Sequence, residues 1–181
     1  MQDSQDPFAM LGVERRFDLD LKVLEKTHRE LSRALHPDKY AQAGASERRA
    51  VLEKAASVNE AWRTVRDPIK RAEALFQLAG IKVGEDNEPK STTAFLMEVL
   101  EEREALADAR AAKDLAKVHA IGEAMTKRAD ATQKKLADGF AALGSTPERG
   151  VVEKLVPLLG ELRFYKRFLD EVAAIEEENE A

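Results

Sequence analysis

The side chains best suited to chemistry in this chain are three histidines, and their spacing does not suit catalysis. His28, His36 and His119 lack the spacing of metal ligands, and no Gly-rich phosphate loop, nucleophile elbow or clustered His/Asp/Ser set accompanies them. The chain has no cysteine, which excludes disulfides and metal sites built on thiolates. We therefore expect no enzymatic activity, no cofactor and no bound metal, and a protein that acts by binding.

One of these histidines lies in a short motif, His36-Pro37-Asp38, within the stretch RALHPDKY at 33–40. Pro37 has no amide hydrogen and clashes with the preceding turn, so a helix ends or kinks there. It also disfavours the helical conformation for His36, and Asp38 is a favoured cap or turn residue. An ordinary loop between two helices explains the same three residues, so the flanking helices must decide.

The helix predicted before this loop, over 19–35, carries a stripe of basic side chains. At about 100° per residue, four of them fall together, a quarter-turn or more from the buried face: Lys22, Lys26, Arg29 and Arg33. The buried face is expected to hold Leu21, Leu24, His28, Leu31 and Leu35. Only Glu30 lies near this basic stripe. The stripe is either a solvated charged face or a basic binding surface.

The composition is that of a folded helical protein. Of 181 residues, 44% are hydrophobic and 35% charged, with a net charge of -5. Ala, Leu, Glu, Lys and Arg dominate, which predicts an all-α fold. The acidic balance argues against nucleic-acid binding. No apolar run is long enough to span a membrane, and MQDSQDPF resembles no leader peptide. We expect a cytoplasmic protein, although a processed organellar chain would look the same.

Breaker residues divide the chain into a first unit at 1–79, a linker at 80–93 and a second unit at 94–181. Charge divides with them: residues 1–75 carry 14 basic and 13 acidic side chains, net +1, and residues 76–181 carry 15 and 21, net -6. Two units with different electrostatics are therefore expected.

The first unit is predicted to contain helices at 7–12, 19–35, 46–66 and 68–79. Asp6 is expected to cap the first helix, with Pro7 at its first position, and Ser46 is a candidate cap for the third. The core face of the third helix is expected to hold Leu52, Ala55, Val58, Trp62 and Val65.

The second unit is predicted to be a three-helix bundle with helices at 91–110, 113–142 and 147–177. Ser91 or Thr92 is expected to start the first of these. Pro157 lies inside the last and is expected to kink it.

An apolar surface is predicted on the far side of the helix at 91–110. Its core face is expected to hold Phe95, Val99, Leu106 and Ala109. Three apolar residues fall away from that face, namely Leu96, Met97 and Leu100, and they are bordered by Glu101, Glu104 and Asp108. Such a patch indicates a partner surface, unless the last helix covers this side too. Glu102 falls near the assumed core face, which the prediction does not explain.

These residues together resemble a known family. The stretch SVNEAWRTVRDPIKRAEAL at 57–75, after the basic helix and the His-Pro-Asp loop, resembles the J-domain of DnaJ-type co-chaperones. The matching residues are Asn59, Ala61, Trp62, Val65, Asp67, Pro68, Arg71, Ala72 and Glu73. TAFLMEVLEEREAL at 93–106 and ELRFYKRFLDEV at 161–172 resemble the C-terminal domain of the HscB family of iron–sulfur co-chaperones.

The resemblance implies a co-chaperone that stimulates the ATPase of a DnaK-type chaperone (HscA-like) and brings it the iron–sulfur scaffold protein IscU. It implies a chaperone-binding surface of Lys22, Lys26, Arg29, Arg33, His36, Pro37, Asp38 and Lys39. It implies a scaffold-binding surface of Leu96, Met97, Leu100, Glu101, Glu104, Asp108 and Phe164. The alternative is a co-chaperone of a general DnaK-type chaperone with a different client. Pro157 and Gly160 depart from the continuous last helix that the family leads one to expect.

Overall fold

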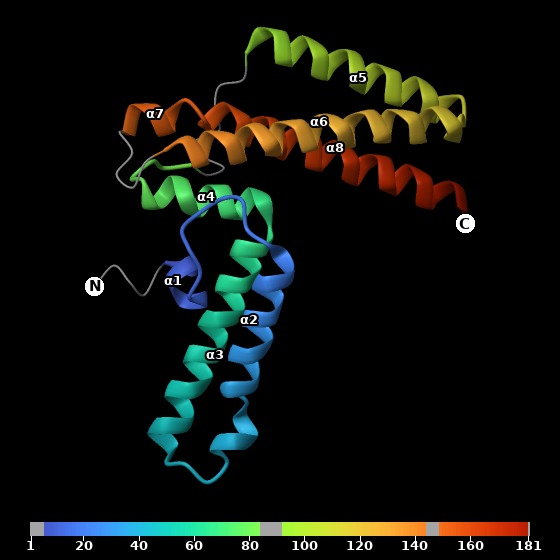
Figure 1. Ribbon diagram of the computed structural model, residues 1–181. Coiled ribbons are helices and arrows are strands. Elements are labelled where there is room, and N and C mark those ends of the chain that lie inside the picture. The colour runs from blue at the N-terminus through green and yellow to red at the C-terminus, as the bar shows by residue number, and fades with distance from the viewer. Residues whose placement is uncertain (1–5, 84–91, 144–148, 181) are drawn as a thin grey trace. The chain divides into compact units, whose positions relative to one another are not determined.

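The computed structural model describes residues 6–83, 92–143 and 149–180, and every regular element in these ranges is a helix. The all-α fold is therefore confirmed (Figure 1). The chain forms two compact units, Met1–Lys82 and Val83–Ala181. Most of the linker expected at 80–93 lies outside the described residues. Among the helices that the structure describes, none is long and apolar enough to cross a membrane.

The first unit consists of α1 (Pro7–Leu11), α2 (Leu21–Ala34), the 3₁₀ helix η2 (Pro37–Tyr40), α3 (Ala45–Arg66) and α4 (Pro68–Leu78). Helices α2 and α3 form an antiparallel hairpin with η2 in the connection, and α1 packs against α3 (Figure 1). Asp6 caps α1 as expected, because its Oδ1 accepts a hydrogen bond from the Phe8 amide at 2.9 Å and Pro7 is the first helical residue.

Two buried-face predictions for the hairpin are wrong. Leu52 of α3 is 54% exposed, and Leu21 of α2 is 50% exposed. The buried residues of α3 are Val58, Ala61 and Val65, all in its C-terminal half. Figure 1 shows the hairpin projecting beyond α1, so the N-terminal half of α3 lies beside α2 and η2 and not beside α1. The α2–α3 hairpin and the short η2 do not enclose the Leu52 side chain, and Leu21 precedes the first buried residue of its helix, Leu24.

The predicted cap of α3 is also wrong. The helix begins at Ala45 after Gly44, and no side-chain hydrogen bond caps it. Ser46 already lies inside the first turn, two residues after the N-cap position that Gly44 occupies.

A buried arginine fastens α4 to the end of α3. Arg71 is 4% exposed, its Nη1 donates to the Val65 carbonyl at 3.0 Å, and its guanidinium lies 4.9 Å from the centre of the Phe17 ring. Burial lowers the pKa of Arg71, and the carboxylates of Asp67 and Asp18 oppose that shift. Arg71 therefore has a structural role in this unit.

The second unit consists of α5 (Thr93–Ala111), α6 (Leu115–Ala142), α7 (Arg149–Glu153) and α8 (Val156–Glu180). Thr92 caps α5 as expected, its Oγ1 accepting from the Phe95 amide at 3.2 Å. The long helices α5, α6 and α8 share one core, whose buried members are Phe95, Leu106, Ala109, Val118, Met125, Phe164, Tyr165, Phe168, Val172 and Ile175. The expected three-helix bundle is present, with α7 as an additional short helix.

The kink predicted at Pro157 is absent because the helix is interrupted before it. Helix α7 ends at Glu153, and α8 begins at Val156, with Pro157 as its second residue. Amide hydrogens in the first turn of a helix have no acceptor within the helix, so a proline there loses no hydrogen bond. Pro157 thus marks a helix start, and the predicted start of the last helix at 147 lies outside the described residues.

Candidate partner-binding surfaces

The His-Pro-Asp loop is held by hydrogen bonds within itself. His36 is the N-cap of η2, and its Nδ1 accepts from the Asp38 amide at 3.3 Å. The Lys39 amide donates to the His36 carbonyl at 3.0 Å, and the Tyr40 hydroxyl donates to the Ala34 carbonyl at 3.4 Å. Pro37 is the first residue of η2, where its fixed φ favours the turn. The loop therefore has a defined shape before any partner binds.

The polar groups of this loop face solvent. The side chains of His36 and Asp38 are 58% and 88% exposed. The Asp38 carboxylate approaches the imidazole, with its Oδ2 3.5 Å from Nδ1 of His36. Most of its surface stays accessible, so a basic group on a partner can reach it and donate hydrogen bonds to it.

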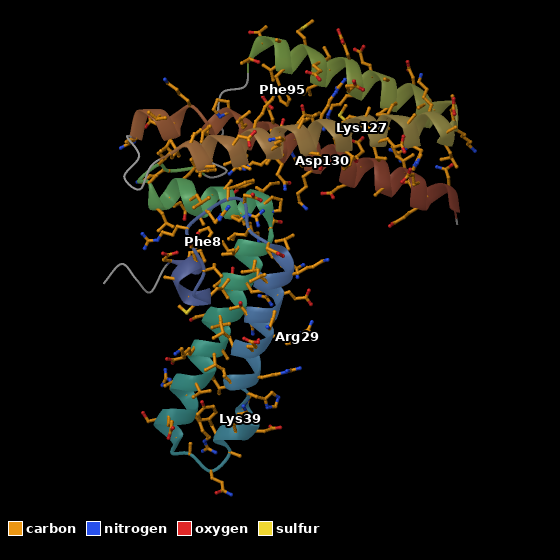
Figure 2. The ribbon with its side chains drawn as sticks, viewed as in Figure 1. Phe8, Arg29, Lys39, Phe95, Lys127 and Asp130 are labelled. Atoms are coloured by element: carbon orange, nitrogen blue, oxygen red, sulfur yellow. The ribbon has the colours of Figure 1, made fainter. Side chains whose placement is uncertain are left out.

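All four residues of the basic stripe are exposed on α2 (Figure 2, where Arg29 is labelled). The stripe is more mixed in charge than the sequence indicated, because Glu25 as well as Glu30 pairs with it. Arg29 Nη2 lies 2.8 Å from Glu25 Oε1, and Lys26 Nζ lies 4.0 Å from Glu30 Oε1. Within the described part of the chain, the other two members, Lys22 and Arg33, form no ion pair.

His28 holds the hairpin together, in keeping with its expected place at the edge of the core. Its Nε2 lies 3.0 Å from Asn59 Oδ1, and its ring stacks on Trp62 at 4.8 Å between centroids. These contacts give Asn59 and Trp62 of the J-domain-like stretch a physical role that sequence reasoning missed. They fix the register of α2 against α3, and so the place of the basic stripe relative to the loop.

The predicted apolar surface on α5 is exposed. Leu96, Met97 and Leu100 are 55%, 55% and 53% exposed, so α8 does not cover them. The acidic residues that border them are exposed as well, namely Glu101, Glu104 and Asp108. We call these six residues the α5 surface. Apolar side chains in the middle with charges around them are the usual anatomy of a protein interface.

Phe164 does not belong to the α5 surface in this structure. It is 8% exposed and packs edge-to-face on Phe95 at 5.5 Å between ring centroids. Its place in the predicted surface came from the family resemblance, which did not show that Phe95 packs against it. Phe164 supports the helix that carries the surface.

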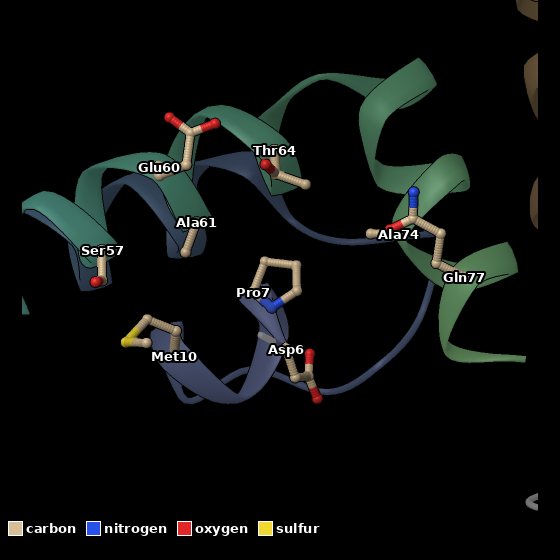
Figure 3. A pocket seen from close by; sticks show the side chains of 9 residues that line it. All are labelled: Asp6, Pro7, Met10, Ser57, Glu60, Ala61, Thr64, Ala74 and Gln77. Carbon is tan, nitrogen blue, oxygen red and sulfur yellow. The ribbon is translucent and has the colours of Figure 1, made fainter. Parts of the chain in front are cut away.

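A shallow pocket of about 410 Å³ lies among α1, α3 and α4 (Figure 3). Its two carboxylates are Asp6 and Glu60. Asp6 is 1% exposed and already holds the Phe8 amide and, at 2.6 Å, the Arg15 Nε, while Glu60 lies 3.5 Å from Arg63. Both groups are engaged in local pairs, so the pocket supplies no free acid or base. In the described ranges, no group of three or more His, Asp or Glu side chains could hold a metal ion.

Comparison with known proteins extends over both units. Residues 91–173 match the family model described as the HSCB C-terminal oligomerisation domain. The chain is 34% identical over 167 residues to the Co-chaperone protein HscB homolog of Paraburkholderia phymatum, covering 92% of this chain and 89% of that protein. The chain belongs to the HscB co-chaperone family. The homologue from Paraburkholderia xenovorans is 33% identical over 165 residues, covering 91% of this chain and 90% of that one.

Solved HscB structures agree with this assignment. The chaperone HscB from Vibrio cholerae is 27% identical and superposes with a TM-score of 0.80 over 96% of this chain and 99% of that chain. Human HscB superposes with a TM-score of 0.83 over 97% of this chain and 84% of that chain, at 22% identity, which bears on the fold alone. The family resemblance inferred from the sequence is thus confirmed.

Proposed function

We propose that this HscB-family co-chaperone stimulates the ATPase of an HscA-like DnaK-type chaperone and delivers the scaffold protein IscU to it, which promotes transfer of the iron–sulfur cluster. One observation carries the proposal: the chain exposes two surfaces of opposite character, one on each unit. The first is the ordered His-Pro-Asp loop beside a basic stripe. The second is the apolar α5 surface with its acidic border.

The first surface suits a site on the chaperone that is acidic opposite the basic stripe and carries a basic group opposite Asp38. Basic side chains attract an acidic partner and orient its approach, which raises the association rate more than the affinity. Asp38 then accepts hydrogen bonds from a basic group of the chaperone, and these are strengthened by its charge. Because His36 already holds the Asp38 amide, little ordering entropy is lost when the loop docks.

The second surface suits an apolar face of the scaffold. Leucine and methionine fill irregular gaps, and the flexible, polarizable thioether of Met97 adapts to a partner's shape. The acidic border favours a basic edge on that partner. In this proposal the cluster stays on the scaffold as cargo, and this chain binds the scaffold without touching the metal.

The test is the steady-state ATPase rate of the HscA-type chaperone from the same organism, with this protein and IscU added separately and together. Synergy between the two supports the proposal, because only a protein that contacts both partners produces it. Stimulation that does not change when IscU is added would support the chaperone-binding surface and indicate a different client. No stimulation at all would overturn the chaperone half of the proposal.

A further inference from the structure

Helix α5 carries the α5 surface but has few core contacts of its own. Over its 19 residues the buried ones are Phe95 near the start, and Leu106 and Ala109 near the end. Val99 is only partly buried. The middle of the helix therefore needs another attachment, since a hydrophobic stripe this sparse leaves it free to roll.

A single arginine on α6 provides that attachment. Arg128 Nη1 lies 2.7 Å from Glu98 Oε1 and 2.9 Å from Glu102 Oε1. The two carboxylates stand one turn apart on α5, with one guanidinium nitrogen between them. Its N–H directions do not align with either oxygen, so the contact is ionic. The Glu102 side chain is only 22% exposed, which explains why a glutamate falls so near the core face. We call this arrangement the Arg128 clasp.

The clasp continues into α8. The Thr132 hydroxyl on α6 donates to Glu161 Oε2 at 3.0 Å. Tyr165 on α8 lies edge-to-face with Phe95 at 5.9 Å between centroids. Burial, followed by the charges of Glu161 and Glu98, raises the pKa of Tyr165, while Arg128 and a hydrogen bond with Thr132 oppose the rise. Charges on all three long helices thus meet in one polar layer next to Phe95.

The clasp and the α5 surface lie on opposite sides of α5. At about 100° per residue, Glu98 and Glu102 stand roughly 170° around the helix from the centre of the three apolar residues. Any roll of α5 that separates the carboxylates from Arg128 also turns Leu96, Met97 and Leu100 away from their present direction. The clasp therefore controls where the surface points.

We infer that Arg128 is a positioning residue for scaffold binding: by clasping Glu98 and Glu102 it fixes the rotation of α5 at which the apolar residues face the partner. This inference rests on the proposed function, because it names IscU as the partner. Arg128 itself stands behind the surface and does not touch the scaffold.

The experiment measures the affinity of the full chain for IscU by isothermal titration calorimetry. Arg128→Gln is expected to weaken binding about tenfold, because α5 then samples rotations that do not fit the partner and the competent fraction falls. The matched control is Lys127→Gln. Lys127 is exposed on the same helix (Figure 2), and its substitution removes the same charge without touching the clasp. It is expected to leave the affinity unchanged.

A mutant cycle separates positioning from a general loss of stability. Glu98→Gln with Glu102→Gln releases the clasp from the other side, so adding Arg128→Gln to that pair is expected to cause no further loss. Losses that add, or an Arg128→Gln protein that binds as tightly as the wild type, would overturn the inference.

A second readout does not depend on the scaffold. In the free protein, amide hydrogen exchange in α5 is expected to become faster in Arg128→Gln, while α6 and α8 keep their protection. Unchanged exchange in α5 would count against the clasp. If Arg128→Gln does not fold, Arg128→Lys replaces it, since one ammonium group on a shorter chain holds both carboxylates less well. If the wild type does not bind IscU, the proposed function fails, and the amide hydrogen exchange of α5 in Arg128→Gln still tests the clasp.

Discussion

Replacing the apolar centre of the α5 surface provides the sharpest measurement of scaffold binding. The variant is Leu96→Ala with Met97→Ala and Leu100→Ala. Phe164 is left unchanged, because it is buried against Phe95 and its loss would damage the core. Truncating the three exposed side chains leaves the core of the bundle unchanged.

The size of the effect follows from exposure. Fully burying a leucine or methionine side chain stabilises by about 1.5 to 3 kcal/mol. Each of the three side chains is a little over half exposed, at 53% to 55%, so a partner can bury only about half of each. The three together then contribute about 2 to 4 kcal/mol, which corresponds to a dissociation constant roughly 30- to 1,000-fold weaker.

The assay is calorimetric titration with IscU, with circular dichroism to verify the fold. The control is Leu52→Ala, because Leu52 has the same exposure, 54%, but lies on the α2–α3 hairpin of the first unit. We expect the control to bind as the wild type does. A triple variant that folds and still binds IscU with wild-type affinity would refute the assignment of this surface.

Three further predictions concern single groups. Asp38→Asn is expected to abolish ATPase stimulation and to leave IscU affinity unchanged; a parallel loss of IscU affinity would contradict separate surfaces. Arg33→Ala is expected to reduce stimulation at low salt more than Arg29→Ala does, because Arg29 is already paired with Glu25 at 2.8 Å; equal losses in a chaperone ATPase titration would count against this. Peroxide is expected to convert exposed Met97 to its polar sulfoxide before buried Met125 and to weaken IscU binding; mass spectrometry locates the oxygen, and a Met97→Leu protein that loses affinity equally would disprove the link.

Local chemistry made several features predictable from the sequence. Asp6 before Pro7 and Thr92 before α5 are side chains that accept from the first free amides of a helix, and both do so. The rotation of residues about α5 also predicted which side Leu96, Met97 and Leu100 occupy. Each of these predictions needs only neighbours within one or two turns.

The wrong predictions share a dependence on distant parts of the chain. Periodicity places Leu52 on the inner face of α3 but does not reveal how far along the helix other elements cover that face. Phe164 was assigned to the edge of the surface from the family resemblance, and the sequence does not show which ring of α5 packs against it. The Arg128 clasp joins Glu98 and Glu102 of α5 to a residue some 26 to 30 positions away, so no local sequence pattern predicts it.

Pro157 illustrates a different difficulty. Proline within an apolar helical pattern indicates either a kink in one long helix or the start of a second helix. Both are compatible with a residue that has no amide hydrogen to donate. Leu155 and its neighbours continue the pattern on both sides. Only the course of the backbone between α7 and α8 decides between the two.

The self-capped loop has a consequence for how the motif can persist through evolution. Its side-chain hydrogen bonds join residues from Ala34 to Tyr40, and the backbone hydrogen bonds of 36–40 reach only as far as Ala43. The two long helices act as a stem that presents the loop, while the hydrogen bonds that set the shape of the loop lie within residues 34–43. The same loop can therefore occur on different helical hairpins. The sequence of the rest of the domain can change without loss of the loop's shape.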